Sequence, residues 1–177
     1  TIETNQGDIV IEFVTDAPEA VNSFAFLAAK NFFNDDVFYY VDHTYVAQSG
    51  DPNCRIDSPT ICTGFGDAGY SLPLEATAAS HGQWSVAMPA ISQADRVHGS
   101  QFRIYFQEDT RLDGHETVFG TVTEGRDILE GLADLQICTA LTQATDNCVD
   151  EIPADALIIQ DVTQAERLDR MRRDFVA

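Results

Sequence analysis

Apolar and polar positions alternate with a period of two at the start of the chain. The alternation runs through residues 1–14 and is interrupted once, by Gln6-Gly7. The apolar residues that follow this period are Ile2, Ile9, Ile11 and Phe13. A two-residue period broken by a turn dipeptide predicts a β-hairpin with one buried face.

A helical period follows the hairpin. Apolar residues recur at spacings of three and four on one side of the segment that ends at Lys30, namely Ala20, Phe24, Leu27 and Ala28. Pro18 stands in the first turn, and Asp16 precedes Glu19 by three residues, which is a capping pattern. We predict a helix up to Lys30, capped by Asp16 and packed on a sheet.

The rest of the chain has the short apolar runs of a strand-rich protein. They predict strands at 37–41, 44–48, 83–87, 101–106, 117–121 and 156–161. Helical patterns occupy 126–135 and 164–175. Residues 49–74 are rich in Gly, Pro, Asp and Cys and have little periodicity, so we expect a long loop there. Loops of this length inside a small domain usually serve a function.

The pattern of elements leaves two architectures open. Many short strands with two internal helices fit a closed antiparallel barrel with capping helices, and they also fit an open α+β sheet. A chain of 177 residues without repeats or a linker is expected to form one domain with its own core.

The charge of the chain excludes some partners. With 29 acidic and 10 basic residues, the formal net charge is −19. Such a surface repels phosphate backbones and anionic lipids, so we expect no nucleic-acid partner. No apolar run approaches the ~20 residues that cross a bilayer, so we expect no membrane insertion.

The cysteines fall into two local pairs, Cys54 with Cys62 and Cys138 with Cys148. Neither pair has a histidine placed to complete a zinc-ligand pattern, and we expect no metal site. Two disulfides that close short, turn-rich loops are the favoured interpretation, although four cysteines allow three pairings and four free thiols stay possible. Disulfides indicate an oxidising compartment, so we expect a periplasmic or secreted protein rather than a cytoplasmic one.

Local motifs choose between the two architectures. In chain order they are Val37-Phe38-Tyr39-Tyr40-Val41, Gln48-Ser49-Gly50-Asp51-Pro52, Gly99-Ser100-Gln101-Phe102, Leu112-Asp113-Gly114, Val118-Phe119-Gly120 and Glu124-Gly125. In order and spacing the series resembles the cyclophilins over about residues 1–161. The resemblance implies a mainly β fold, a closed eight-stranded antiparallel barrel with two capping helices and a peptide groove on its outside. It places the domain at 1–162 and a C-terminal helical extension at 163–177.

The resemblance also implies an activity. Cyclophilins are peptidyl-prolyl cis-trans isomerases, which act on Xaa-Pro bonds in unfolded or extended polypeptides without a cofactor. We expect this chain to assist folding as a monomer. The barrier, about 18 to 20 kcal/mol, comes from amide resonance. In the family an arginine of a Phe-His-Arg segment donates a hydrogen bond to the prolyl nitrogen. Here Tyr40 holds that position, and its neutral hydroxyl is a weaker donor than a guanidinium. We therefore expect reduced activity.

Most other groove positions keep the family's character. Gln48 and Gln101 match glutamines that order the site and contact the peptide backbone. The wall and pocket positions are Ala87, Leu112, Tyr45, Val46 and Met88, the last matching a residue that binds the peptide mostly through its backbone.

Three groove positions depart from the family pattern. Arg103 replaces a proline-pocket phenylalanine, Arg111 replaces a wall aromatic, and Glu116 replaces a pocket-edge histidine. Arg111 predicts weak cyclosporin binding. One hypothesis is that Arg103 donates to the prolyl nitrogen, held by Gln48, while Glu116 pairs with Arg103 or Arg111. The alternative is drift on a groove that only binds proline peptides, and a scaffold role for the 49–74 loop is a third possibility.

The remaining aromatic and histidine residues receive structural interpretations. We expect Tyr39 and Trp84 to pack in the core or across the sheet. Isolated histidines in turn-like positions are more often surface or hydrogen-bonded residues than ligands, so no chemistry is assigned to His43, His81, His98 and His115.

Overall fold

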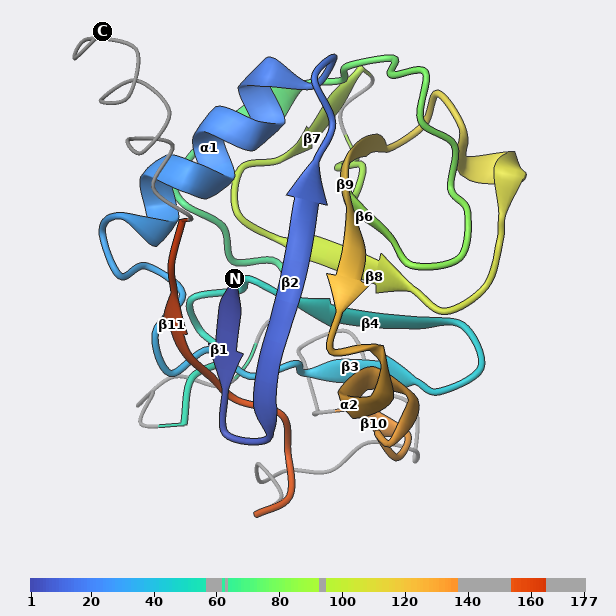
Figure 1. Cartoon of the computed structure of the whole chain (residues 1–177). Coiled ribbons are helices and arrows are strands. Elements are labelled where there is room, and N and C mark those ends of the chain that lie inside the picture. The colour runs from blue at the N-terminus through green and yellow to red at the C-terminus, as the bar shows by residue number, and fades with distance from the viewer. Residues whose placement is uncertain (57–61, 63, 93–94, 137–153, 165–177) are drawn as a thin grey trace, which may run out of the picture.

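One antiparallel sheet dominates the computed structural model, which describes residues 1–56, 62, 64–92, 95–136 and 154–164 (Figure 1). Within these residues its strand order is β10-β3-β4-β8-β6-β9-β2-β1-β11. The bounds are β1 Ile2–Thr4, β2 Gly7–Phe13, β3 Tyr40–Asp42, β4 Val46–Ser49, β6 Ser85–Met88, β8 Phe102–Tyr105, β9 Thr117–Glu124, β10 Leu135–Gln136 and β11 Ile159–Val162. The predicted mainly β class is confirmed, and so is the N-terminal hairpin.

The sheet curls into a barrel that is only partly closed. Its order ends at β10 on one side and at β11 on the other. Across the remaining gap, the backbone N–H of Phe38 donates to the carbonyl of Leu157 at 3.0 Å, and Val37 forms an isolated bridge with Ile158. Residues 37 and 38 therefore bond to the segment before β11, and the strand predicted at 37–41 begins only at Tyr40. The closed barrel that we expected is corrected to a partly closed one.

In the part of the chain that the structure describes, two α-helices accompany the sheet, α1 Pro18–Ala28 near one end of its strands and α2 Arg126–Glu130 near the other (Figure 1). The predicted apolar face of α1 is buried. Helix α2 is shorter than predicted, because the chain leaves the helix at Gly131 and then pairs with β3 as β10. The C-terminal helix predicted at 164–175 falls outside the described residues apart from Gln164.

The predicted cap of α1 is wrong. No side chain of the cap residue bonds to the first turn, and the carboxylate of Asp16 instead accepts from the backbone of Ala78 at 2.7 Å. Glu75 takes over the role, since its carboxylate accepts the backbone N–H groups of Glu19 and Ala20 at 3.0 and 2.9 Å. A residue distant in sequence thus satisfies the helix N-terminus.

A small second sheet was not predicted. Strands β5 Ser71–Pro73 and β7 Arg96–His98 pair in antiparallel fashion, and β5 lies inside the segment that we expected to be loop. Each has only three residues, too few for an alternating pattern to stand out.

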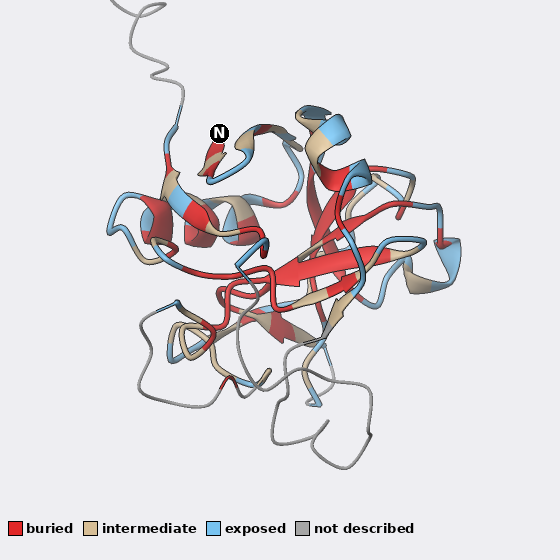
Figure 2. Ribbon diagram, turned by 90° about the horizontal axis from the view of Figure 1, so that it is seen from below, coloured by how far each residue is buried: buried red, intermediate tan, exposed pale blue. Residues whose placement is uncertain are grey.

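The main core lies inside the curled sheet, and Figure 2 shows buried residues concentrated along the strands and the inner side of α1. Phe24 of α1 stacks on Phe33 and packs edge-on against Phe102, with ring centroids 4.9 and 5.4 Å apart. Such pairs add to the stabilisation from buried apolar area. Phe102 and Ile104 of β8 are buried in this core, so the alternate residues Arg103 and Tyr105 point to the opposite face of the sheet.

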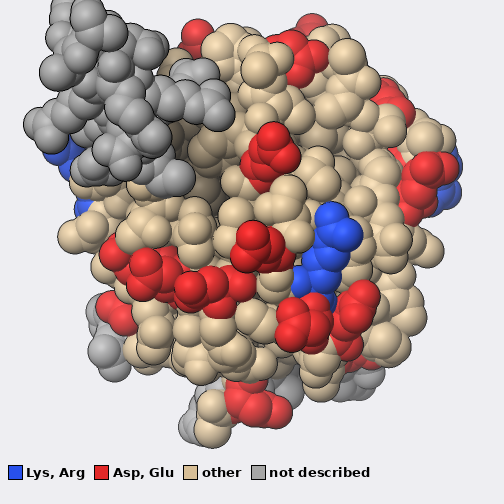
Figure 3. Space-filling model, viewed as in Figure 1, with Lys and Arg blue, Asp and Glu red and all other residues tan. Residues whose placement is uncertain are grey.

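The surface has the expected acidity, and acidic side chains are spread over the face drawn in Figure 3 with few basic ones. Within the described residues, neither helix reaches the length or apolar character of a membrane span.

Candidate functional site

A row of paired residues crosses the middle of the sheet on the face opposite the main core. Tyr40 of β3 pairs with Gln48 of β4, which pairs with Arg103 of β8. Arg103 pairs in turn with Ala87 of β6, and Ala87 with Val118 of β9. Directly paired residues of antiparallel strands project to the same face. The register therefore brings together the residues that the sequence assigned to the groove.

A second apolar cluster surrounds this row. Its buried members are Val46, Ala87, Tyr105 and Val118, and the partly buried Tyr40, Tyr45, Ala79 and Leu112 pack against them. All the apolar groove positions predicted from the sequence except Met88 lie here. The side chain of Met88 is buried in the main core, because it follows Ala87 in β6 and successive residues alternate between faces. Any contact of Met88 with a peptide involves its backbone, as we expected.

Arg103 is held from two sides. Its Nε donates to Oε1 of Gln48 at 2.9 Å, and its Nη1 donates to Oε1 of Glu116 at 2.6 Å. Burial works to lower the pKa of Arg103, but Glu116, Tyr105 and Tyr39 together outweigh it and raise the pKa, so the guanidinium stays charged. The side chain is 32% exposed, and the hydroxyl of Tyr105 is a further polar neighbour of the guanidinium. The site thus presents a charged donor above an apolar floor.

Glu116 is the anion of this site, with 5% of its side chain exposed. Its Oε2 accepts a hydrogen bond from the hydroxyl of Tyr105 at 2.6 Å, while Oε1 binds Arg103. Burial works to raise the pKa of Glu116, but the neighbouring His81, Arg103 and Tyr105 outweigh it and lower the pKa. Of the two arginine partners considered for Glu116, the structure shows Arg103.

Gln48 is oriented by a buried polar group behind it. Its Nε2 donates to the hydroxyl of Tyr39 and to Oε1 of Gln101, both at 2.6 Å. The Tyr39 hydroxyl also donates to the same Gln101 oxygen at 2.7 Å. With its amide nitrogen committed, Gln48 turns its oxygen to Arg103. Tyr39 is buried as predicted, but its role in positioning Gln48 was missed, although it lies in the motif that contains Tyr40.

Gln101 is fully buried and meets the long loop rather than an open groove. Its Nε2 donates to the carbonyls of Gly66 and Gly64 at 2.6 and 3.2 Å. With both ends of its amide engaged, Gln101 orders the site from behind. The contact between Gln101 and a bound peptide stays a prediction.

The same loop contains the predicted disulfide between Cys54 and Cys62. Next to it, Arg55 donates from Nε to the buried Asp36 at 2.8 Å, which ties the start of the loop to the sheet. The pair predicted between Cys138 and Cys148 falls outside the described residues.

Arg111 lies apart from Arg103. Its Nε and Nη2 donate to the two carboxylate oxygens of Asp109 at 2.7 and 2.8 Å, and its side chain is 86% exposed. Asp109 also accepts from the hydroxyl of Tyr45 at 2.8 Å. Burial and this hydrogen bond raise the pKa of Tyr45 to about 12. Arg111 therefore stands at the rim, where it replaces an apolar wall with a solvated charge.

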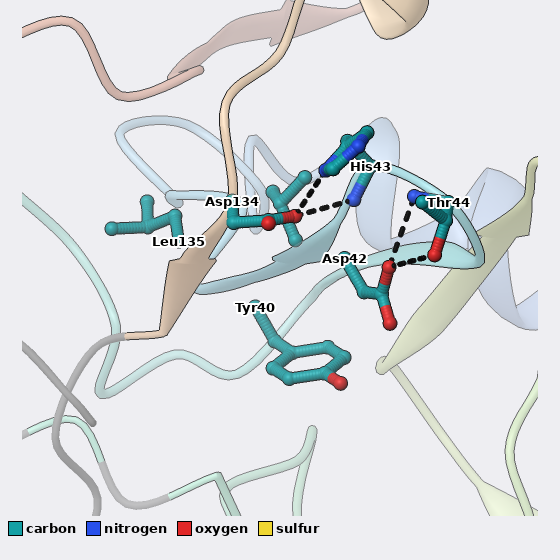
Figure 4. A pocket seen from close by; sticks show the side chains of 7 residues that line it. Tyr40, Asp42, His43, Thr44, Asp134 and Leu135 are labelled. Carbon is teal, nitrogen blue, oxygen red and sulfur yellow. Dashed lines mark hydrogen bonds and ion pairs between the residues drawn. The ribbon is translucent and has the colours of Figure 1, made fainter. Parts of the chain in front are cut away.

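A hollow of about 360 Å³ lies beside the outer end of the row (Figure 4). Tyr40, Asp42, His43 and Asp134 line it with their neighbours. Nδ1 of His43 is 2.7 Å from Oδ1 of Asp134, and Asp42 accepts from Thr44. The ligand atoms of Asp42, His43 and Asp134 lie within 4.8 Å of one another, but His43 and Asp134 are exposed and all three already bond to neighbouring groups. The cluster alone does not indicate a metal site.

Comparisons with known proteins identify the family of the chain. The family model described as "Cyclophilin type peptidyl-prolyl cis-trans isomerase/CLD" matches residues 1–163. The Helicobacter pylori (strain ATCC 700392 / 26695) protein named "Peptidyl-prolyl cis-trans isomerase" is 38% identical over 136 residues, which cover 73% of this chain and 77% of the relative. "Peptidyl-prolyl cis-trans isomerase 10" of Caenorhabditis elegans is 31% identical over 144 residues, covering 77% and 83%.

A solved structure has the same fold. It is a cyclophilin type peptidyl-prolyl cis-trans isomerase of Cryptosporidium parvum in the presence of the dipeptide Ala-Pro, with a TM-score of 0.72, 24% identity and coverage of 93% of this chain and 97% of that one. The strand order, the groove-side row and the sequence matches lead to one conclusion: this chain belongs to the cyclophilin-type peptidyl-prolyl cis-trans isomerase family of enzymes.

Proposed function

We propose that this chain isomerises Xaa-Pro bonds in extended, proline-containing polypeptides, and that Arg103 supplies the hydrogen bond to the prolyl nitrogen. The observation that carries the proposal is the bond from Arg103 Nε to Oε1 of Gln48 on the groove side of the sheet. Gln48 matches the glutamine that orders the family's site, and here the guanidinium that it holds comes from β8. Tyr40 lies on the other side of Gln48.

The chemistry requires a donor and an apolar floor. Rotation about the Xaa-Pro bond breaks amide resonance and leaves a lone pair on the prolyl nitrogen at the twisted state. A donor that binds this lone pair stabilises the twisted state more than either planar state, which lowers the barrier. The Nη2 group of Arg103 is suited to this, while Ala87 and Val118 form the floor beneath the proline ring.

Glu116 limits the strength of this donor. Its carboxylate lies 2.6 Å from Nη1 of Arg103 and offsets part of the guanidinium's charge. A partly neutralised cation attracts the prolyl lone pair less strongly than a free one. We therefore propose an activity below that of family members that keep the arginine at the position of Tyr40.

The test is an NMR exchange assay of cis/trans interconversion on a panel of Xaa-Pro peptides. We expect Arg103→Ala to lower kcat/KM at least tenfold, which corresponds to about 1.4 kcal/mol of barrier. Tyr40→Phe removes only a hydroxyl and should lower kcat/KM by less than about threefold. The reverse ranking of the two variants would assign the donor to Tyr40.

The competing function is a binding module that kept the groove without the chemistry. The ion pair between Arg103 and Glu116 favours it, since an arginine paired with a buried carboxylate can be structural. A folded wild-type protein that binds Ala-Pro peptides without accelerating their exchange would establish this function.

The setting of the activity is part of the proposal. The Cys54–Cys62 disulfide supports an oxidising compartment, the periplasm or the exterior, and we propose a monomer in which residues 163–177 extend the domain 1–162. Because Arg111 is a solvated charge at a wall position, we propose weak cyclosporin binding. Titration calorimetry tests this, and a nanomolar dissociation constant would contradict it.

A further inference from the structure

His81 is enclosed between two carboxylates on the far side of Glu116. It precedes β6 in the chain, and 1% of its side chain is exposed. Its ring Nδ1 lies 2.8 Å from Oδ1 of Asp113, and the His81 backbone N–H donates to the same oxygen at 2.8 Å. Because ring and backbone bind one carboxylate, the orientation of the imidazole is fixed.

The opposite ring nitrogen faces the Arg103 site. Nε2 of His81 lies 3.7 Å from Oε2 of Glu116, close enough for an ion pair but too far for a hydrogen bond. Nε2 is buried and has no hydrogen-bond partner among the described residues. The ring packs edge-on against Tyr105, with centroids 5.3 Å apart. Burying a polar nitrogen without a partner is costly, so the site favours a protonated ring attracted to Glu116.

Glu116 connects this histidine to the proposed donor, because its other oxygen accepts from Arg103. With His81 protonated, the two cations His81 and Arg103 balance the two anions Asp113 and Glu116. The remaining nearby acid is Asp109. The backbone N–H of Asp109 donates to the backbone carbonyl of His81, while the Asp109 carboxylate accepts from the exposed Arg111. The charge of His81 therefore decides how much of the Glu116 charge is left for Arg103.

The electrostatics around His81 favour the charged ring. Burial works to lower the pKa of His81, but Glu116 and Asp113 outweigh it and raise the pKa above its ordinary value. Asp113 responds in the opposite sense, since its bonds to His81 lower the pKa of its carboxyl.

We infer that His81 is a positioning residue for the isomerase reaction: in its protonated form it shares the Glu116 carboxylate with Arg103 and so preserves the charge of the donor. The inference rests on the proposed function of Arg103. When His81 loses its proton, Arg103 becomes the one cation left beside Glu116 among the described residues. Its guanidinium is then more fully neutralised and binds the prolyl lone pair less strongly.

The expected consequence is a pH dependence of catalysis. The value of kcat/KM should fall about three- to tenfold as the pH rises through the pKa of His81. The exchange assay between about pH 5 and pH 9 measures this on the wild type, His81→Asn and Asp113→Asn. His115→Asn is the matched control, since His115 is exposed and directly precedes Glu116 in the sequence. Asp113→Asn keeps the imidazole and removes one carboxylate, so it should move the midpoint to lower pH.

A merely structural role gives a different result. If the role is structural, His81→Asn lowers kcat/KM by the same factor at every pH, and the pH midpoint of Asp113→Asn equals that of the wild type. Either finding overturns the inference. The NMR signal of the Arg103 Nε–H provides a readout independent of activity. It should shift with the same midpoint as kcat/KM in the wild type and lose that transition in His81→Asn.

The two proposals fail in distinguishable ways. If Arg103→Ala keeps full activity while the Arg103 Nε–H signal of the wild type still follows the titration of His81, the proposed donor is wrong and the coupling between His81 and Arg103 stands. If Arg103→Ala loses activity but neither the pH profile nor the Nε–H signal depends on His81, the donor stands and the inference about His81 is wrong.

Discussion

Arg103 and Tyr40 flank Gln48 on one side of the sheet, each paired with it directly from a neighbouring strand. The glutamine is therefore within reach of a side chain from either position. Of these two described side chains, Arg103 is the one that donates a hydrogen bond to Gln48. Under the proposed function, the donor that Gln48 holds therefore comes from β8 instead of from β3.

This relationship predicts that the arginine can be moved back. Arg103→Phe restores the phenylalanine of the family pattern and should lower kcat/KM at least tenfold. Adding Tyr40→Arg to this variant places a guanidinium on the other side of Gln48 and should recover most of the loss. Exchange assays on the two variants and the wild type measure this. A double variant no more active than Arg103→Phe would show that Gln48 cannot hold a donor on β3.

The charges around Glu116 predict a stability that depends on pH. Because the pKa of Glu116 is lowered in the folded state, its contribution is present above the unfolded value of about 4.5 and is lost as pH falls through the folded pKa. Because the pKa of His81 is raised, its contribution is present below the unfolded value of about 6.5 and is lost as pH rises through the folded pKa. Both contributions are complete at about pH 5 to 6.

Urea denaturation of the wild type and Glu116→Gln over this range measures the effect. The difference in free energy of unfolding should peak near pH 5 to 6 at about 1 to 3 kcal/mol and narrow on both sides. Glu108→Gln, at an exposed position, is the control. A difference that stays constant from pH 4 to about pH 9 would contradict the assigned charges.

Much of the fold follows from local sequence. The alternation at Ile9 and Ile11 predicts the hairpin, and the spacing of Phe24 and Leu27 predicts the buried face of α1, because both periods reflect one-sided burial. What was missed depends on distant contacts. Glu75 caps α1 from 55 residues beyond Ala20, and β10 forms because β3 offers it an unpaired edge.

The site divides in the same way. Family motifs supplied Gln48 and Arg103, and the predicted contact between them is present. The buried role of His81 was not predicted, because a histidine before Gly82 has no local signal that it will lie between Asp113 and Glu116. That environment exists only after η1 Thr110–Leu112 and β9 fold against β6 and β8.

The cap supplied by Glu75 predicts the stability of α1. Its carboxylate accepts two backbone N–H groups at the positive end of the helix. We expect Glu75→Ala to lower the free energy of unfolding by about 1 kcal/mol and Asp16→Ala to lower it less. Urea denaturation of both variants tests the assignment. If Asp16→Ala proves the more damaging, Asp16 caps the helix as the sequence pattern suggested.

The Cys54–Cys62 disulfide is expected to stabilise the protein and to support the site. Closing a loop with a sequence separation of 8 should contribute about 2 to 3 kcal/mol, because it restricts the unfolded chain. The tied loop also supplies the carbonyls of Gly64 and Gly66 to Gln101. Removing the disulfide should therefore weaken the orientation of Gln101. Because Gln101 orients Gln48 and Gln48 orients Arg103, kcat/KM should fall together with the free energy of unfolding.

Urea denaturation and exchange assays on a Cys54→Ser/Cys62→Ser variant measure both effects. Cys138→Ser/Cys148→Ser is the matched control, since it makes the same two substitutions at the other pair of cysteines and leaves Cys54 and Cys62 unchanged. The side-chain amide protons of Gln101 report directly on the contact between the loop and Gln101. They should exchange with solvent faster once the carbonyls of Gly64 and Gly66 no longer accept from them. If the first variant is destabilised but keeps wild-type kcat/KM and a protected Gln101 amide, the disulfide stabilises the fold without holding the site.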